Sequence, residues 1–330
     1  MKKNRFMIWF LILLLGMSLC SGCGGKSLPD SGDKISVVCT TFPHYDWVRN
    51  LIAGNEEKYE LTLVMDNGAD LHNYQPTTDD MVIIGSCDIF IYVGGESDAW
   101  VEDALKQAAN DDMKVINLMD VMGDSVREEE IVEGMDTGSD EEHNHEDEAE
   151  ETEYDEHIWL SLRNAQVMVT AIADVLAQTD SENKDLYEEN TERYIEALSA
   201  LDAEYSSTVQ SAQRHTLIFG DRFPFRYMTD DYGLDYYAAF NGCSAETEAS
   251  FETIAFLSGK LDELNIPVIL VIENSDQSVA QAVVDNTASR NQRILTLNSL
   301  QSVTDKDIQS GVTYLSVMQD NLEVLREALN

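Results

Sequence analysis

Basic residues are scarce in this chain, which has 21 Lys and Arg against 62 Asp and Glu in 330 residues. The resulting formal net charge of −41 repels nucleic acid phosphates and anionic lipid headgroups, and it attracts cations. We therefore expect no nucleic acid partner. The length is enough for about two domains, each with a core of its own.

Cysteine is sparse as well, with five residues in the whole chain. Cys39, Cys87 and Cys243 lie far apart, without the short spacing of a zinc knuckle or a disulfide framework. Cys39 could bridge to Cys87 if their strands are neighbours, but we expect buried free thiols. The chain also lacks an H-E-x-x-H helix, a G-x-S-x-G turn and a nucleotide-binding glycine loop, which counts against an enzyme.

The N-terminus resembles a bacterial lipoprotein signal. A basic start precedes the apolar run FMIWFLILLL at residues 6–15, which is too short to span a membrane comfortably. Small residues then precede Cys23, as in a lipobox, where the cysteine becomes the lipidated first residue. We predict a signal peptide at 1–22, a tether at 23–34, and an extracytoplasmic protein anchored to the bacterial cell membrane by its N-terminal lipid. A plain signal peptide is the alternative.

Strand-like apolar runs alternate with helical patterns in both halves of the mature chain. The expected strands are residues 35–41, 61–65, 89–93 and 115–118, then 216–219, 236–240, 268–272 and 294–297. This order predicts an α/β fold of two lobes, each a mostly parallel sheet flanked by helices. Ligands of such sheets bind beyond the carboxyl ends of the strands, so a cleft between the lobes is the expected site.

A long segment without Gly or Pro separates the two halves, at residues 162–208. Its apolar positions repeat at helical spacing, which predicts one long linking helix, or two with a break near 179–181. We expect an N-terminal lobe at 35–160, the linking helix at 161–210 and a C-terminal lobe at 211–330.

An acidic loop is expected at residues 127–156, with 16 carboxylates between Glu128 and Glu156. His143 and His145 lie inside it, and we interpret the loop as a weak, mobile cation collector. The alternative is a solvated loop with no binding role. The loop ends at His157, directly before an apolar Ile-Trp-Leu segment.

Three histidines lie where predicted strands or loops end. His44 follows the first strand, His72 lies in the loop after the second, and His157 ends the acidic loop. These are the positions at which cleft residues of this architecture belong. His215, at the start of a predicted strand, is expected to be structural.

Two of these histidines also carry a resemblance to a known family. GADLHNYQPTTDD, around His72, resembles the G-x-D-P-H-x-Y-x-P-x-x-x-D loop of metal-binding lipoproteins that feed ABC importers of zinc or manganese. DEHIWLSLRNA, around His157, resembles the segment that supplies their second metal histidine. The resemblance, to the zinc-uptake solute-binding proteins of cluster A-I, covers essentially the whole mature chain. It implies two α/β lobes joined by a long rigid helix, with metal between them.

The chain departs from this family at two ligand positions. Gly220 stands where the resemblance implies a third ligand, and Gln301 stands near the place of a fourth. Our candidates to complete the site are Asp221 first, then His44, with Glu273 as a further possibility. Nitrogen-rich coordination through His44 would suit zinc, whereas Asp221 and Glu273 would move the site toward manganese.

The function we predict is capture of Zn²⁺, or alternatively Mn²⁺, by a monomeric binding protein that delivers the ion to an ABC permease. One alternative is a metal-dependent lipoprotein hydrolase that uses the same histidines. The other is an acidic surface or adhesion protein, in which the acidic loop binds calcium or a basic partner.

Overall fold

The computed structural model describes residues 34–136, 153–244 and 248–330. The predicted signal peptide, lipidated Cys23 and nearly all of the tether lie outside the described residues, as do His143 and His145 of the acidic loop. Among the helices that are described, none combines the length and the apolar character needed to cross a membrane.

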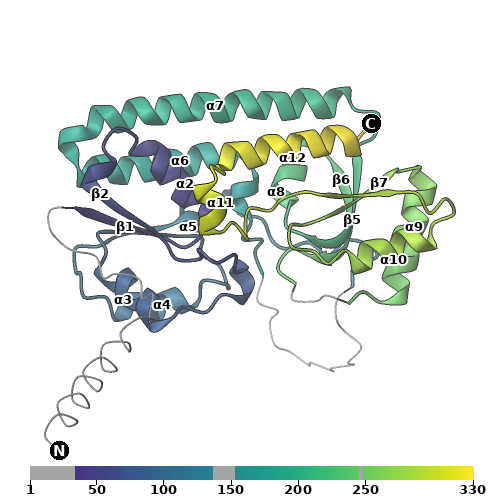
Figure 1. Ribbon diagram of the computed structural model, residues 1–330, viewed down its shortest axis with the longest axis horizontal. Helices are drawn as coiled ribbons and strands as arrows, with labels where there is room; N and C mark the ends of the chain where they lie inside the picture. Colours follow the sequence, from purple (N-terminus) through teal and green to yellow (C-terminus); the bar gives the residue numbers. More distant parts are fainter. Residues whose placement is uncertain (1–33, 137–152, 245–247) are drawn as a thin grey trace, which may run out of the picture.

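The N-terminal lobe is built on a four-stranded parallel sheet with the order β2-β1-β3-β4. Its strands confirm the four that the sequence predicts, with ends that differ by a few residues: β1 (Ile35–Cys39), β2 (Tyr59–Leu63), β3 (Ile89–Tyr92) and β4 (Lys114–Asn117). Thr77 caps α3 (Thr78–Ser86), and α4 (Trp100–Lys106) lies beside it on the same face of the sheet (Figure 1).

The C-terminal lobe repeats this plan with a second parallel sheet of order β6-β5-β7-β8. The strands are β5 (Thr216–Phe223), β6 (Asp235–Asn241), β7 (Val268–Val271) and β8 (Arg293–Thr296). One face is covered by α9 (Phe251–Leu264) and α10 (Ser278–Asn286). The prediction of two α/β lobes with parallel sheets is confirmed.

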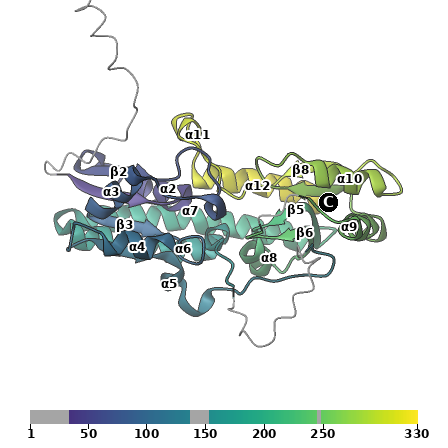
Figure 2. The same cartoon turned by 90° about the horizontal axis from the view of Figure 1, so that it is seen from below.

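The linking segment forms two helices, α6 (Leu162–Thr179) and α7 (Lys184–Ser211). Asp180 ends the first, where its carboxylate accepts from Lys58 Nζ at 2.6 Å and from the Tyr187 hydroxyl at 2.6 Å. Of the two arrangements that the sequence left open, the broken one is therefore present. The longer helix, α7, runs along both lobes, and the lobes lie next to each other along the long axis of the molecule (Figures 1 and 2).

One hydrophobic core joins the lobes. Val37 of the first sheet and Phe219 of the second belong to the same buried cluster, which also includes residues of α6, α7 and the C-terminal helix. The flanking helices are α2 (Phe42–Leu51) and α12 (Tyr314–Ala328), and the short ones are α5 (Leu118–Met122), α8 (Arg226–Tyr232) and α11 (Asp305–Gln309). The opposite face of each sheet has a separate cluster. Cys39 and Cys87 are buried free thiols, as predicted.

Candidate metal centre

His72 lies on a single 3₁₀ turn, Leu71–Asn73, in the loop that follows β2. Asp70 starts the turn, because its Oδ1 accepts the His72 amide at 3.0 Å. The imidazole Nδ1 lies 2.8 Å from Ser97 Oγ and 3.6 Å from Glu156 Oε2. These contacts fix one ring nitrogen and leave Nε2 directed away from them.

The loop after β3 supports His72 from behind. Gly94 and Gly95 both have positive φ, of 97° and 83°, which allows the chain to turn closely around Glu156. A Cβ atom at Gly95 would lie 2.3 Å from Glu156 Oε1, so only glycine fits there. The Ser97 amide then donates to the same oxygen at 2.8 Å, which links the Glu156 carboxylate to the His72 ring through one serine.

His157 is fully buried at the start of the turn that precedes α6. Asp155 Oδ1 accepts both the His157 amide, at 2.8 Å, and the ring Nδ1, at 2.9 Å. A carboxylate on one ring nitrogen orients the imidazole and makes the other nitrogen a better metal ligand. The Trp159 ring packs edge-on against this imidazole at 5.4 Å, so its orientation is constrained from two sides.

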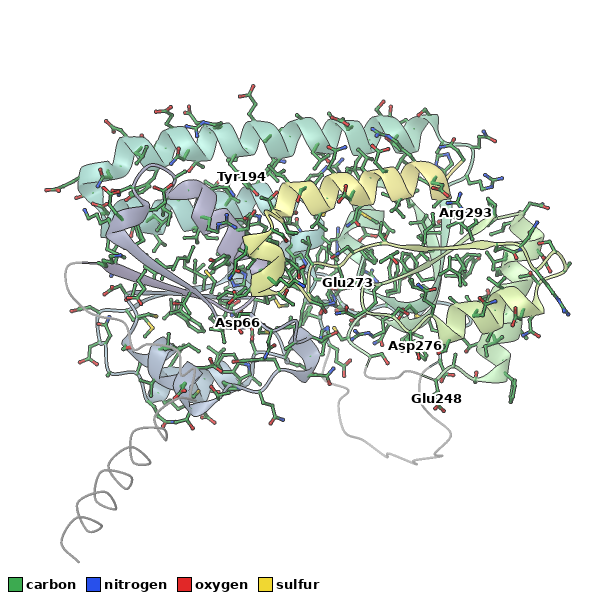
Figure 3. All side chains as sticks on the ribbon, viewed as in Figure 1. Asp66, Tyr194, Glu248, Glu273, Asp276 and Arg293 are labelled. Carbon is green, nitrogen blue, oxygen red and sulfur yellow. The ribbon has the colours of Figure 1, made fainter. Side chains whose placement is uncertain are left out.

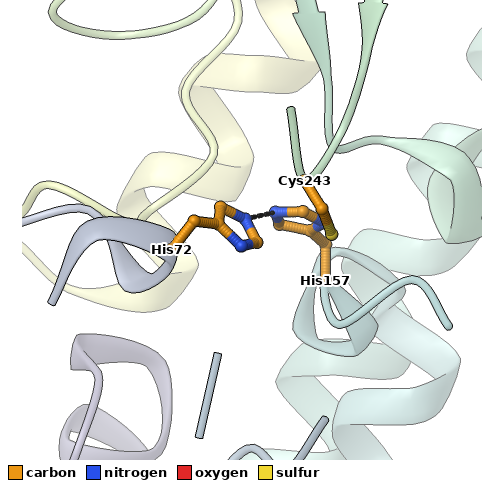
Figure 4. A group of neighbouring side chains, drawn as sticks. All are labelled: His72, His157 and Cys243. Carbon is orange, nitrogen blue, oxygen red and sulfur yellow. Dashed lines mark hydrogen bonds between the residues drawn. The ribbon is translucent and has the colours of Figure 1, made fainter. Parts of the chain in front are cut away.

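The two imidazoles meet through their remaining nitrogens. His72 Nε2 and His157 Nε2 are 3.1 Å apart, and we call these residues the histidine pair (Figure 4). Burial and the neighbouring His157 lower the pKa of His72 to about 3. Burial also acts to lower the pKa of His157, but Asp155 outweighs it and the pKa is raised. The His72 imidazole is therefore neutral, which is the form that binds metal.

Cys243 is the third potential ligand at this point, and the sequence interpretation missed it. Its Sγ and the two histidine nitrogens all lie within 4.8 Å of one another, and no other described residue joins them in a group of this kind. Burial raises the pKa of the Cys243 thiol, and Glu129 adds to the effect. Along the chain, Cys243 has no cysteine or histidine at a metal-binding spacing, so the sequence gives no local signal for this ligand.

Gly242 allows this approach. A Cβ atom there would lie 2.9 Å from the Phe223 carbonyl oxygen and 3.1 Å from Cε1 of His157. The turn after β6 can therefore pass against the His157 ring only because position 242 has no side chain. Sequence reasoning treated Cys243 as one of three scattered thiols, and spacing along the chain could not reveal this contact.

A cavity of about 310 Å³ opens beside the histidine pair. We call it the acidic cavity, and it is lined by His72, Glu96, Ser97, Glu129, Glu153, Tyr154, Glu156 and Cys243. Four of these side chains are carboxylates. Such a cavity concentrates cations at the point where the imidazole and thiol donors meet.

His44 is not brought to the histidine pair. Its ring packs back on the start of α2, where the Thr41 amide donates to Nε2 at 3.1 Å and Thr41 Oγ1 lies 3.1 Å from Nδ1. Burial lowers its pKa to about 3. Both ring nitrogens thus have partners within their own helix cap, which is a structural use of the side chain.

Asp221 and Glu273 lie on a different cavity, of about 440 Å³, between the lobes (Figure 3 labels Glu273). Asp221 is directed at backbone amides, of Arg222 at 2.8 Å and Ile272 at 3.4 Å. Glu273 accepts from the Ser299 amide at 2.6 Å and holds the loop after β8. Neither is grouped with the histidine pair.

The two departures from the family pattern have physical explanations. A Cβ atom at Gly220 would lie 2.5 Å from Ala280 Cα, because β5 packs here against α10. A ligand side chain therefore has no room at this position. Gln301 is buried, and both of its nitrogens already have partners. The backbone N–H donates to Glu273 Oε1 at 3.1 Å, and the side-chain Nε2 donates to Ser299 Oγ.

An ion pair between Arg222 and Asp70 connects the two lobes near the site. Arg222 Nη2 lies 2.5 Å from Asp70 Oδ2, while the other oxygen of Asp70 caps the His72 turn. Arg222 lowers the pKa of Asp70 although burial opposes this. The C-terminal lobe therefore contacts the loop that positions His72.

Two parallel-sheet lobes with a buried histidine pair and an acidic cavity between them are the features of a two-lobed α/β binding protein. Residues 37–328 match the family described as "Zinc-uptake complex component A periplasmic" (ZnuA). The chain belongs to this family of zinc-uptake solute-binding proteins of ABC importers, as the sequence motifs predicted. Membership agrees with a binding protein rather than a hydrolase.

Two relatives and one solved structure support this family membership. The chain is 31% identical over 324 residues to zinc-binding lipoprotein AdcA of Streptococcus pneumoniae serotype 4, covering 96% of this chain and 60% of that protein. It is 27% identical to high-affinity zinc uptake system protein ZnuA of Bacillus subtilis, over 94% of each chain. It superposes on the Zn(II)-bound ZnuA-like domain of S. pneumoniae AdcA with a TM-score of 0.68 and 26% identity, covering 90% of this chain and 99% of that domain.

Proposed function

We propose that this protein captures Zn²⁺ between its lobes with His72 and His157 and delivers it to an ABC permease. The observation that carries the proposal is the 3.1 Å separation of the two Nε2 atoms, each backed by a polar partner on the other ring nitrogen. Imidazoles whose second ring nitrogen is held by a polar partner are typical zinc ligands.

The carboxylates around the histidine pair favour a divalent cation as the transported ligand. Glu129, Glu153 and Glu156 line the acidic cavity next to His72, and they supply negative charge that two imidazoles lack. Relatives named for zinc binding and zinc uptake support the same ion. Mn²⁺ is the competing cargo, and we propose zinc because nitrogen donors suit it better.

The location and assembly belong to the same proposal. We infer an extracytoplasmic monomer attached to the membrane through a lipid on Cys23, after removal of residues 1–22. The domain limits we propose remain 35–160, 161–210 and 211–330. The resemblance of Cys23 and its preceding residues to a lipobox supports the anchor, and the zinc-binding lipoproteins among the relatives agree with it.

Competitive Zn²⁺/Mn²⁺ titration by calorimetry tests the proposal. We expect one tightly bound zinc ion per chain, and we expect His72→Ala and His157→Ala each to weaken zinc binding about a hundredfold or more, since each removes one of only a few ligands. His215→Ala is the matched control, because His215 is exposed and its backbone carbonyl accepts the Asp235 amide, a contact that alanine retains. Zinc binding by either site variant at the parent's affinity would refute the assignment.

A further inference from the structure

We propose that the Cys243 thiolate is the third zinc ligand and makes the site selective for thiophilic ions such as Zn²⁺ over Mn²⁺. The inference rests on the proposed zinc capture by the histidine pair and deepens it. It explains how this chain binds an ion although Gly220 offers no side chain at the position where the family has a third ligand.

The geometry supports three ligands on one ion. Cys243 Sγ and one ring nitrogen from each imidazole all lie within 4.8 Å of one another, so small movements bring all three donors to bonding distance of a shared centre (Figure 4). The sulfur comes from the C-terminal lobe and His72 from the N-terminal lobe. An ion held by both would therefore connect the lobes.

The backbone of the turn is shaped for this contact. Gly242 lets the chain pass against the His157 ring, as described above, and the Cys243 amide donates to Glu129 Oε1 at 3.1 Å. Glu129 therefore fixes the residue whose side chain points to the histidine pair. The cysteine also lines the acidic cavity, so an ion that enters the cavity reaches the sulfur.

Glu129 also provides a route for the thiol proton. Its carboxylate accepts the Cys243 backbone amide at 3.1 Å and lies close enough to the thiol to raise the thiol pKa. When zinc binds, the Zn–S bond forms and the S–H bond breaks, and the proton passes to the Glu129 carboxylate and on to water. No oxidation state changes, and the thiolate charge offsets part of the charge of the ion.

Sulfur has a direct consequence for selectivity. Thiolates bind zinc strongly and manganese poorly, whereas carboxylates accept both. A His₂Cys centre therefore discriminates against Mn²⁺ more strongly than a site completed by Asp221 or Glu273 would. The same preference extends to other thiophilic ions.

Cobalt(II) substitution of the full chain tests the ligand directly. We expect the parent to show a thiolate-to-cobalt charge-transfer band in the near ultraviolet, and Cys243→Ser to lose this band while keeping the visible ligand-field bands. A parent cobalt complex without the band would overturn the inference. The zinc proposal would still stand if His72→Ala lost binding in that case, and it would fail if His72→Ala bound normally.

The Zn²⁺/Mn²⁺ affinity ratio gives a second readout. We expect Cys243→Ser to lower zinc affinity about tenfold to a hundredfold with little change for manganese, and Cys243→Asp to lower the ratio by raising manganese affinity. Cys87→Ser is the matched control, since its thiol is buried away from the site and donates to the Ile84 carbonyl. An unchanged ratio in Cys243→Ser overturns the inference.

Alkylation keeps the inference testable even if a variant fails to fold. Zinc should protect Cys243 of the parent from iodoacetamide, measured by peptide mass spectrometry, with buried Cys39 and Cys87 as internal references. Equal modification of Cys243 with and without zinc overturns the inference.

Discussion

The two sides of the site hold their candidate ligands differently. On the N-terminal side, His72 and His157 each have a polar partner on one ring nitrogen. On the C-terminal side, the candidate ligand is the Cys243 thiol, on the turn after β6. His72 is held by Ser97, and His157 by Asp155. Cys243 depends on one backbone hydrogen bond and on the closeness that Gly242 permits. The histidine side is preorganised by side chains, and the cysteine side by the path of the backbone.

This difference shows which parts of the site tolerate change. Ligands positioned by hydrogen-bonded side chains lose affinity when a partner is replaced, even if the ligand remains. A ligand positioned by close packing of its backbone loses affinity instead when an added atom displaces that backbone. The following three variants test this contrast, in order of decreasing expected effect.

Asp155→Asn should have the largest effect. The amide keeps the size of the side chain but not its charge, so His157 loses the partner that makes it a strong ligand, and zinc affinity should fall about 10- to 100-fold. Calorimetric titration measures this. Asp180→Asn is the control, because Asp180 is equally buried but serves the junction between α6 and α7. Its zinc affinity should equal the parent's, and equal losses in both variants would contradict the prediction.

Gly242→Ala should have an intermediate effect. The added methyl group would contact the Phe223 carbonyl oxygen and the His157 ring, so the turn must move and take Cys243 with it. We expect zinc affinity to fall about tenfold, as for loss of a supporting contact, together with a weaker thiolate-to-cobalt band. Gly259→Ala, which meets no atom within 4 Å, is the matched control. An unaltered cobalt spectrum would show that closeness at Gly242 does not position the sulfur.

Arg222→Gln should have the smallest effect. It removes the ion pair with Asp70 but leaves the Asp70 cap on His72 in place. Both side chains of the pair are largely buried, at 16% and 18% exposed, and the desolvation of such a pair offsets much of its attraction. We expect zinc affinity to fall no more than about fivefold, with faster zinc release in stopped-flow chelation. Asp70→Asn, which weakens both the ion pair and the cap, should release zinc faster still. Slower release in either variant would contradict a stabilising contact between the lobes.

The sequence predicted the sheets and the histidine pair because both are local signals. β-branched runs mark buried parallel strands, and His72 and His157 each lie in a short motif with distinctive neighbours. The break in the linking helix was left open, since the Asp180 contacts with Lys58 and Tyr187 involve residues far apart or on the following turn.

The expected third ligands illustrate what sequence alone does not reveal. Asp221 follows the missing ligand in sequence, but β5 changes register between Phe219 and Arg222, and the carboxylate turns to the Ile272 amide. His44 is three residues after Thr41, the spacing of a helix cap, and the structure uses it as one. Cys243 joins the histidine pair across 86 residues from His157, so only the folded chain brings it there.

The shared core under α7 has a mechanical consequence. A helix of 28 residues is about 42 Å long, and it packs on α2 at one end and on α12 and α8 toward the other. Separating the lobes as rigid bodies would disrupt this packing, which costs far more free energy than moving a surface turn. Ion exchange is therefore expected to use shifts of the His72 and Cys243 turns. The long helix thus holds the two lobes at a fixed separation, and we expect the metal site to open through its loops.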